Sequence, residues 1–114
     1  MKDCVSCKIG RHELQAMVVH ETNEIIAFRD INPEAPVHIL IAPKQHFSAL
    51  KEFHAAEEGL LGRMILAAKG IADKEKIGTR GFRLIWNEGA DGRQTVGHVH
   101  LHLLGGRKLC WPAG

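Results

Sequence analysis

The segment His98-Val99-His100-Leu101-His102-Leu103-Leu104 decides the fold and points to the site. Histidine and apolar residues alternate along it, which is the two-residue period of a β-strand with one polar and one apolar face. The three histidines therefore share one face, and their Cα atoms are expected to stand about 6.8 Å apart along the strand. The alternation predicts a strand that packs on a core with one side and carries a row of imidazoles on the other.

Three interpretations of the histidine row differ in their chemistry. The first is polar filler on a half-exposed strand, although histidine at all three positions is unusual for that role. The second is a catalytic metal held by three imidazoles, since His-x-His places two ligands on one ion. The third is nucleophilic attack on phosphorus, in which a neutral imidazole, held in one tautomer by a hydrogen bond, forms a covalent phosphohistidine.

The segment before the histidine strand favours the third interpretation. Its glycines leave the backbone open to close approach, and its amides and hydroxyl offer hydrogen bonds to phosphate oxygens. The glycines are Gly89, Gly92 and Gly97, and the hydrogen-bonding side chains are Asn87, Gln94 and Thr95. We therefore predict a phosphate pocket that leads into the histidine strand.

The rest of the chain supplies further strands and one helix. Runs rich in apolar and β-branched residues predict strands at residues 15–20, 24–28, 37–42 and 81–87, with the histidine strand at 96–104. Apolar residues at steps of three and four predict an amphipathic helix from residue 48 to about 73, with a short helical turn at 48–53. Residues 1–114 contain no repeat or linker and are expected to form one α+β domain, a mainly antiparallel five-stranded sheet covered by the long helix.

Composition narrows the function classes. Fifteen Lys and Arg residues against 13 Asp and Glu residues give a net charge of +2, and the basic residues are scattered, so a nucleic-acid partner is not expected. No run approaches the roughly 18 apolar residues of a membrane span, and the first residues lack the apolar core of a signal peptide. We expect a soluble cytoplasmic protein with no membrane partner. Its three cysteines are an odd number, which argues against a disulfide framework.

Several motifs together resemble the histidine-triad (HIT) superfamily. Residues 98–104 match its signature of alternating histidine and apolar residues, and the match continues over nearly the whole chain. The other matching segments are residues 27–33, 36–38, 41–46, 87–92, 105–107 and 111–112. In their order and spacing they are similar to the nucleotide-binding Hint branch of that superfamily.

The resemblance implies an enzyme and its substrate class. Members of this branch hydrolyse purine nucleoside phosphoramidates, such as adenosine monophosphoramidate, and are homodimers in which two domains join their sheets. His100 would then be the nucleophile on the α-phosphorus and His102 would contact the phosphate, while His38 and His98 would support the site by hydrogen bonds. No cofactor would be required for the chemistry. The alternative from another class is a nucleotide-binding regulatory or scaffold protein whose hydrolysis is incidental.

The resemblance also assigns a nucleotide pocket. Asp30 would hold the ribose hydroxyls, Phe28, Ile31 and Leu40 would form the base pocket, and Asn87, Gln94, Thr95 and Val96 would line the phosphate site. Taken alone, these positions have ordinary structural explanations. The apolar residues suit a core, Asp30 suits a turn, and His38 suits a buried histidine with satisfied hydrogen bonds.

Three positions bear on substrate preference within the resemblance. Thr95 stands where the family usually has serine, which keeps the hydroxyl and adds a methyl group. Arg93 occupies a position that is often glycine and would place a cation beside the phosphate or in solvent. Trp111 would reach the site of the other subunit and tune the leaving-group side.

The pair Cys4-x-x-Cys7 could supply two thiolates to one zinc ion, and a tetrahedral structural site needs two more ligands. His46 and His98 are the candidates, and the resemblance supports them, since many members with this motif are similar to Cys2His2 zinc proteins. The alternative is two free surface thiols, because a single Cys-x-x-Cys is a weak signal. The remaining histidines, His12, His20 and His54, are expected on the surface, and Cys110 has no evident partner.

Overall fold

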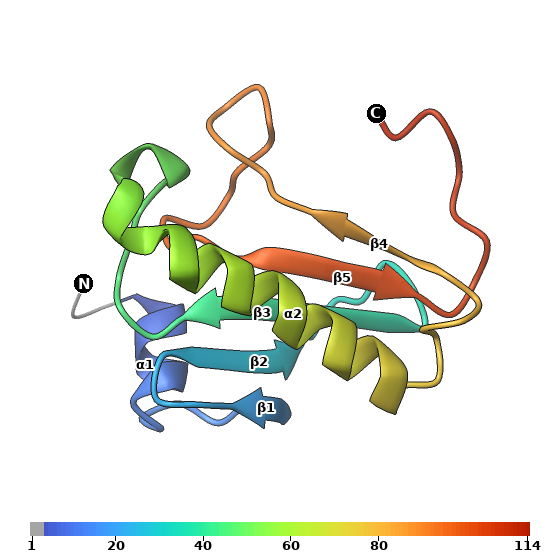
Figure 1. Cartoon of the computed structure of the whole chain (residues 1–114), viewed down its shortest axis with the longest axis horizontal. Helices are drawn as coiled ribbons and strands as arrows, with labels where there is room; N and C mark the ends of the chain where they lie inside the picture. Colours follow the sequence, from blue (N-terminus) through green and yellow to red (C-terminus); the bar gives the residue numbers. More distant parts are fainter. Residues whose placement is uncertain (1–3) are drawn as a thin grey trace.

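One antiparallel sheet forms the frame of the molecule. The computed structural model describes residues 4–114 and contains a five-stranded sheet (Figure 1). Its strands are β1 (Val18–Glu21), β2 (Ile25–Arg29), β3 (Val37–Pro43), β4 (Phe82–Ile85) and β5 (Leu101–Gly105). They lie in the order β1-β2-β3-β5-β4, and every neighbouring pair is antiparallel. The predicted α+β class is therefore confirmed, and β1 and β4 are the two edges.

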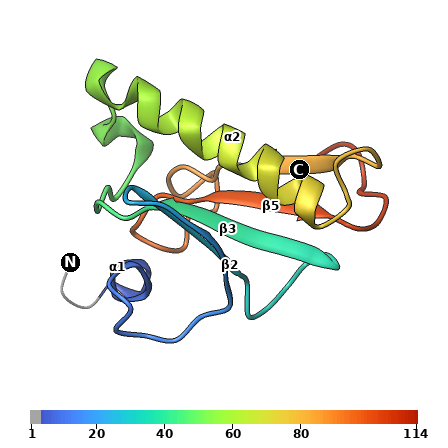
Figure 2. The ribbon, with the colours of Figure 1, turned by 60° about the horizontal axis from the view of Figure 1, so that its bottom comes forward.

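Helices lie on both faces of the sheet. The long helix α2 (Glu58–Lys74) crosses one face, and the short helix α1 (Val5–Gly10) lies against the other (Figure 2). Two 3-10 turns, η1 (Leu50–Glu52) and η2 (Ala55–Glu57), precede α2. Within residues 4–114, no helix is both long enough and apolar enough to span a bilayer.

The pleat of the strands divides their side chains between two cores. On β3, Ile39 and Ile41 belong to the large core beneath α2, together with Met64 of that helix. The intervening Leu40 packs against a smaller cluster on the other face, which consists of Ile9, Ile26 and Phe28. The large core thus holds α2 against the sheet. The α1 face has only a small apolar cluster, so it can also carry polar side chains.

Several predicted boundaries are wrong, and the most consequential concerns the histidine strand. β5 begins at Leu101, so His98 and His100 precede the strand and only His102 lies within it. The His98 side chain points to the α1 face, where it contacts Cys4 and Cys7 and is fully buried, while the neighbouring Val99 belongs to the large core under α2. The interpretation of the row as polar filler on a surface strand does not survive this burial.

Other boundaries shift by a few residues. The first strand begins at Val18 rather than residue 15, and β4 ends at Ile85 rather than residue 87. The predicted short helical turn at 48–53 is confirmed as η1, whereas the long helix begins only at Glu58, after η2, rather than near residue 48. Helix α1 is not predicted from the sequence, because its six residues make fewer than two turns and show no helical period.

Candidate functional site

A cleft of about 780 Å³ opens on the α1 face of the sheet. Phe28, Ile31 and Leu40, which are predicted to form the base pocket, all line it. Asp30, Val96 and His100 line the same cleft, so predicted base, ribose, phosphate and nucleophile residues meet around one space. Ile31 is 91% exposed and therefore sits at the rim rather than in the wall.

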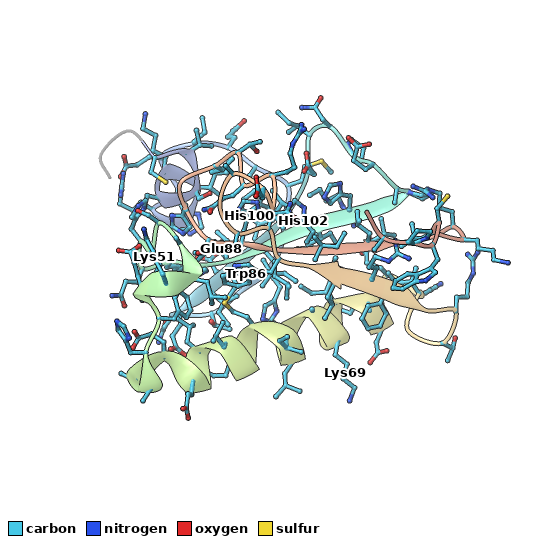
Figure 3. All side chains as sticks on the ribbon, turned by 90° about the horizontal axis from the view of Figure 1, so that it is seen from above. Lys51, Lys69, Trp86, Glu88, His100 and His102 are labelled. Atoms are coloured by element: carbon cyan, nitrogen blue, oxygen red, sulfur yellow. The ribbon has the colours of Figure 1, made fainter. Side chains whose placement is uncertain are left out.

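Hydrogen bonding fixes the tautomer of His100. Its Nδ1 lies 2.8 Å from the backbone carbonyl oxygen of His98, and a carbonyl can only accept, so Nδ1 carries the proton. In the neutral ring Nε2 then keeps a free lone pair. In this tautomer His100 presents the Nε2 lone pair beside the cleft, on the side of the sheet away from α2 (Figure 3).

A second chain of hydrogen bonds orients His102. The backbone N–H of Glu34 donates to Nδ1 of His38 over 3.1 Å, so the proton of the His38 ring is on Nε2. That Nε2 lies 2.9 Å from Nδ1 of His102 and donates to it. The proton of the neutral His102 ring is consequently on Nε2, and His102 can donate a hydrogen bond from that atom.

Burial keeps these two rings neutral near pH 7. It lowers the pKa of His38 below its usual value, against the opposing attraction of Asp30 and Glu34. It also lowers the pKa of His102 to about 4, and the nearby His100 and His38 add to this effect. A positive charge on either ring would also be repelled by a positive charge on a neighbouring histidine. Neither His38 nor His102 is therefore charged in the unliganded protein at neutral pH.

Ligand atoms of Asp30, His38 and His102 lie within 4.8 Å of one another, which raises the question of a metal. A metal on Nε2 of His38 would require its proton to move to Nδ1, where it would face the N–H of Glu34. Nε2 of His38 also lies 3.5 Å from a carboxylate oxygen of Asp30. The arrangement of these three residues therefore suits a hydrogen-bonded relay rather than a metal site. For the row of three histidines, both ring nitrogens of His98 face other partners, the two cysteines and the Pro43 carbonyl, which does not favour a metal shared by all three rings.

The turn before the triad is braced by its own side chains. The Gln94 amide nitrogen donates to the backbone oxygens of Ser48 and Val96, and its oxygen accepts the N–H of Gly89. The Glu88 carboxylate accepts the backbone N–H groups of Leu50 and Lys51, which lowers its pKa. Both side chains tie the turn to the segment before α2. Figure 3 shows Glu88 on the side of Lys51. The bracing role of Glu88 could not be read from the sequence.

Two of the predicted phosphate residues, Asn87 and Thr95, lie outside the lining of the cleft. Asn87 is half-buried, and Thr95 is exposed. Arg93, in the position where the family often has glycine, adopts φ +63°, in the left-handed region that favours glycine. A Cβ on Gly92 would lie 2.3 Å from the backbone oxygen of Glu88, which explains the need for glycine there.

Four predicted metal ligands converge at one end of the cleft. Nδ1 of His98 lies 3.4 Å from Sγ of Cys4, 3.5 Å from Sγ of Cys7 and 3.2 Å from Nδ1 of His46. Sγ of Cys7 is 3.3 Å from Nδ1 of His46. With Zn–N near 2.0 Å and Zn–S near 2.3 Å, tetrahedral ligand atoms stand roughly 3.3 to 3.8 Å apart. The cluster therefore fits one tetrahedral zinc ion.

The outer nitrogens of the two imidazoles have their own partners. Nε2 of His98 donates to the carbonyl oxygen of Pro43 over 2.8 Å, and Nε2 of His46 lies 3.1 Å from the Ser48 hydroxyl. Because His98 keeps its proton on Nε2, its Nδ1 lone pair points into the cluster, as in many zinc sites. Cys7 is buried, which raises the pKa of its thiol and is inconsistent with a free surface thiol.

The remaining histidines and Cys110 lie away from both groups. His12 is exposed and pairs with Glu21 over 2.8 Å, His54 is exposed, and His20 is half-buried on β1. Cys110 is exposed and is not in a disulfide. The predictions for His12, His54 and Cys110 agree with this placement, whereas His20 is less exposed than expected.

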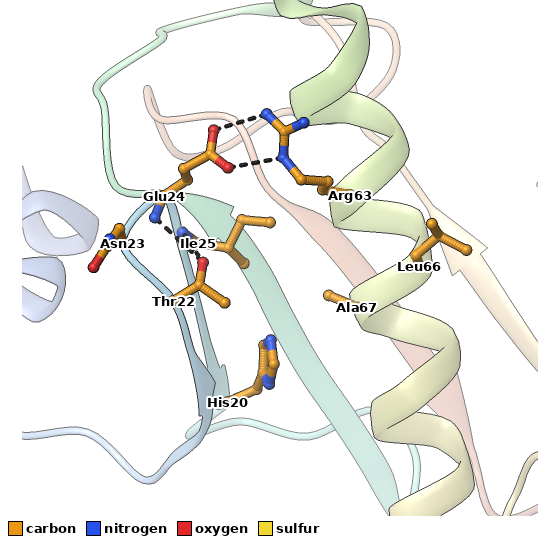
Figure 4. Close-up of a pocket in the computed structure, with 8 residues that line it drawn as sticks. All are labelled: His20, Thr22, Asn23, Glu24, Ile25, Arg63, Leu66 and Ala67. Atoms are coloured by element: carbon orange, nitrogen blue, oxygen red, sulfur yellow. Dashed lines mark hydrogen bonds and ion pairs between the residues drawn. The ribbon is translucent and has the colours of Figure 1, made fainter.

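A second hollow lies between the β1–β2 turn and α2 and holds about 510 Å³ (Figure 4). Its main polar feature is a bidentate ion pair in which Arg63 of α2 donates two hydrogen bonds to the Glu24 carboxylate, over 2.7 and 2.8 Å. These charges satisfy each other, and the lining contains His20 but none of the predicted site residues. The α1 face therefore carries the candidate functional site.

Sequence relatives and solved structures agree with this assignment. An uncharacterized HIT-like protein of Synechococcus elongatus is 48% identical over 113 residues, which cover 99% of this chain and 98% of the relative. A 14 kDa zinc-binding protein of Brassica juncea is 42% identical over 114 residues, which cover 98% of this chain and 100% of the relative. The crystal structure of a HIT family hydrolase from Legionella pneumophila matches with a TM-score of 0.96 and 44% identity, covering 98% of this chain and 100% of the other. The HIT domain family model matches residues 11–109, the histidine triad included, and the chain therefore belongs to the HIT domain family.

Proposed function

We propose that the protein is a hydrolase that cleaves the P–N bond of purine nucleoside phosphoramidates through a nucleotidyl-His100 intermediate. The observation that carries the proposal is the hydrogen bond from Nδ1 of His100 to the His98 carbonyl, which leaves Nε2 free beside a nucleotide-sized cleft. The likeness to a hydrolase of the same family supports the reaction class.

In the first step, the Nε2 lone pair of His100 attacks the α-phosphorus. A bond forms between Nε2 and phosphorus, and the bond between phosphorus and the substrate nitrogen breaks. The amine leaves with its electron pair and takes a proton from solvent. The His100 ring becomes a phosphorylated imidazolium, and its Nδ1–H remains hydrogen-bonded to the His98 carbonyl, which stabilises the positive charge.

In the second step, water attacks the phosphorus and the P–Nε2 bond breaks. The electron pair returns to Nε2, the water proton passes to solvent, and nucleoside monophosphate is released. Overall, one water is added across the P–N bond. His102 donates from Nε2 to a phosphate oxygen, and His38 acts as a positioning residue that holds His102 in the required tautomer.

The nucleoside is held by the residues around the cleft. The purine lies between α1 and the side chains of Phe28 and Leu40, with Ile31 at the rim. The carboxylate of Asp30 accepts the Asn32 N–H at Oδ1, and Oδ2 accepts a ribose hydroxyl. Asn87, Gln94, Thr95 and Val96 belong to the turn that receives the phosphate.

Cys4, Cys7, His46 and His98 would hold a structural Zn²⁺ ion, as their spacing fits the ion and one relative is a zinc-binding protein. The ion would supply a rigid link between α1 and the sheet. It would take no part in the chemistry at phosphorus.

We further propose a cytoplasmic homodimer whose sheets join at β4. β4 is an edge strand, and its Phe82 is partly exposed. Trp111 is 81% exposed, with its ring 5.9 Å from the Arg83 guanidinium of β4, so it is available to a second subunit at that edge. Light scattering measures the mass in solution, and truncation before Trp111 should alter the preference for the leaving amine.

The decisive experiment traps the intermediate. Adenosine phosphoramidate mixed with the protein and quenched rapidly in alkali, where P–N bonds survive, should yield a chain heavier by one adenylate, located on His100 by mass spectrometry. His100→Ala should show no adduct and still bind AMP. An active protein without an adduct on His100 contradicts the mechanism. A protein that binds AMP without measurable turnover favours the regulatory or scaffold alternative.

A further inference from the structure

Helix α1 serves two sites at once. Through Cys7 and the N-cap residue Cys4 it supplies half of the metal cluster. Through Val5, Ser6 and Ile9 it supplies one wall of the nucleotide cleft. The overlap extends to individual residues, since Cys4 and His46 belong to the cluster and also line the cleft. Whatever holds α1 in place therefore also shapes the cleft.

The helix cannot hold itself in place. It has six residues, far fewer than an isolated helix needs for stability in water, and among residues 4–114 no side chain caps its N-terminus. Its apolar anchors are the buried Cys7 and Ile9, of which Ile9 packs on Ile26 and Phe28. The other attachment to the sheet is the cluster, in which cysteines 4 and 7 meet the two imidazoles.

That attachment depends on an ion. Nδ1 of His98 is unprotonated, because its proton is donated from Nε2 to Pro43, and Nδ1 of His46 stands only 3.2 Å away. Two nitrogen atoms at this distance, with two sulfur atoms alongside, stabilise each other only when a cation or a proton lies between them. The four side chains thus link α1 to the sheet when they share an ion, and link it weakly when they do not.

We propose that zinc binding and nucleotide binding are positively coupled through α1, so that each strengthens the other. This inference rests on the proposed function, because it takes the cleft as the nucleotide site. The coupling acts on the nucleoside, which contacts α1, and leaves the phosphate subsite at the histidine triad nearly unaffected. Cys4 and Cys7 are positioning residues in this scheme, since they act on the substrate by holding the wall.

The chemical step should depend less on the ion than binding does. The His98 carbonyl that holds Nδ1 of His100 is kept in place by a second contact, the hydrogen bond from the His98 ring to Pro43. Loss of zinc should therefore raise KM for adenosine phosphoramidate more than it lowers kcat. A purely structural ion, whose loss unfolds the protein, would instead lower the fraction of active protein without changing KM.

The test measures, on the full chain, the effect of zinc on nucleotide affinity and the effect of AMP on zinc affinity. AMP, adenosine and inorganic phosphate are titrated calorimetrically into zinc-loaded and zinc-free protein, with circular dichroism to confirm that the sheet persists. We expect AMP and adenosine to bind about tenfold more weakly without zinc, within the usual range of coupling factors, and phosphate to bind equally. Reciprocally, AMP should raise the affinity for zinc, measured against a chromophoric chelator, by the same factor.

Matched variants on one helix locate the coupling. Val5 lines the cleft, whereas Lys8 on the same helix does not, and neither is a zinc ligand. Val5→Ala should shrink the coupling factor, and Lys8→Ala and the remote Cys110→Ser should preserve it. These variants and the phosphate control keep the test valid if zinc-free protein unfolds, since mere stabilisation of the fold would make phosphate protect zinc as AMP does.

The outcomes separate the two proposals. AMP binding of equal strength with and without zinc overturns the coupling and leaves the proposed function intact. Absence of AMP binding to the zinc-loaded protein overturns both. Protection of zinc by phosphate equal to that by AMP also contradicts the coupling through α1.

Discussion

His98 and His100 are two residues apart and carry the same ring, yet they present opposite nitrogens. His98 donates from Nε2 to the Pro43 carbonyl and turns Nδ1 toward the cysteines, whereas His100 donates from Nδ1 to the His98 carbonyl and keeps Nε2 free beside the cleft. His98 is fully buried, and His100 is partly exposed. A backbone carbonyl thus selects, for each ring, the nitrogen that keeps its lone pair, and that choice separates the proposed metal ligand from the proposed nucleophile.

Removal of each histidine in turn should have the largest effects, and the effects should differ between the two. His100→Ala deletes the nucleophile, so kcat for adenosine phosphoramidate should fall by at least about 10⁴-fold while the melting temperature stays nearly unchanged. His98→Ala removes a buried ring and its bond to Pro43, so the melting temperature should fall, together with the affinity for zinc. Steady-state kinetics and calorimetry of both variants check this. Equal effects on stability would show that the two rings do not have separate roles.

Removal of zinc tests the proposed role of His98 as a ligand of a structural ion. An ion that binds only the folded chain stabilises it by about 4 kcal/mol when its free concentration is one thousand times Kd. Chelation should therefore lower the free energy of unfolding by about that amount, measured by urea titration with and without free zinc. Cys4→Ser should lose most of this dependence on zinc, and the matched Cys110→Ser, at an exposed position, should retain it. A wild-type protein whose stability ignores zinc would refute the structural role.

The low pKa of His102, which accepts a hydrogen bond from His38, makes the free energy of unfolding depend on pH. Below about pH 6.5 the unfolded chain binds a proton at His102 that the folded protein does not bind until its pKa of about 4. Acid therefore favours the unfolded chain, and this group removes up to about 3 kcal/mol of stability as the pH falls from 6.5 to 4.

The measurement is the difference between wild type and His102→Asn in urea unfolding across that range. The zinc ligands also take up protons in acid, but their contribution is common to both proteins and cancels in the difference. The asparagine variant can still accept the N–H of His38, so the relay keeps its geometry. Parallel pH profiles for the two proteins would contradict the low pKa of His102.

The sequence predicts much of the fold because the main signals are local. The alternation around residues 98–104 and the apolar period of α2 each report which face is buried, and both elements form. The motifs also predict the proposed zinc ligands and the proposed base pocket, and the fold brings the residues of each set together. The sequence could not show that His98 leaves the strand, because alternation describes a strand but not where the chain departs from the sheet.

The missed parts of the site depend on contacts between distant segments. Helix α1 is too short for a helical period, and its place follows from ligands 39 or more residues away in the sequence. The tautomers of His38, His98 and His100 are set by backbone groups of Glu34, Pro43 and His98, which carry no side-chain signal. Such assignments require coordinates.

The smallest effect is expected at Nε2 of His46, the nitrogen that faces away from the proposed zinc ion. The Ser48 hydroxyl lies 3.1 Å from Nε2 of His46, where the Pro43 carbonyl serves His98, and Ser48→Ala removes this contact without touching a ligand. Loss of such an outer partner typically costs at least about tenfold in metal affinity, or about 1.4 kcal/mol. Competition with a chromophoric chelator should show this loss for Ser48→Ala, while Ser48→Thr, which keeps the hydroxyl, should restore most of the affinity. If both variants bind zinc like the wild type, the orientation of His46 comes from packing alone, and only His98 directs its lone pair into the cluster by means of a hydrogen bond.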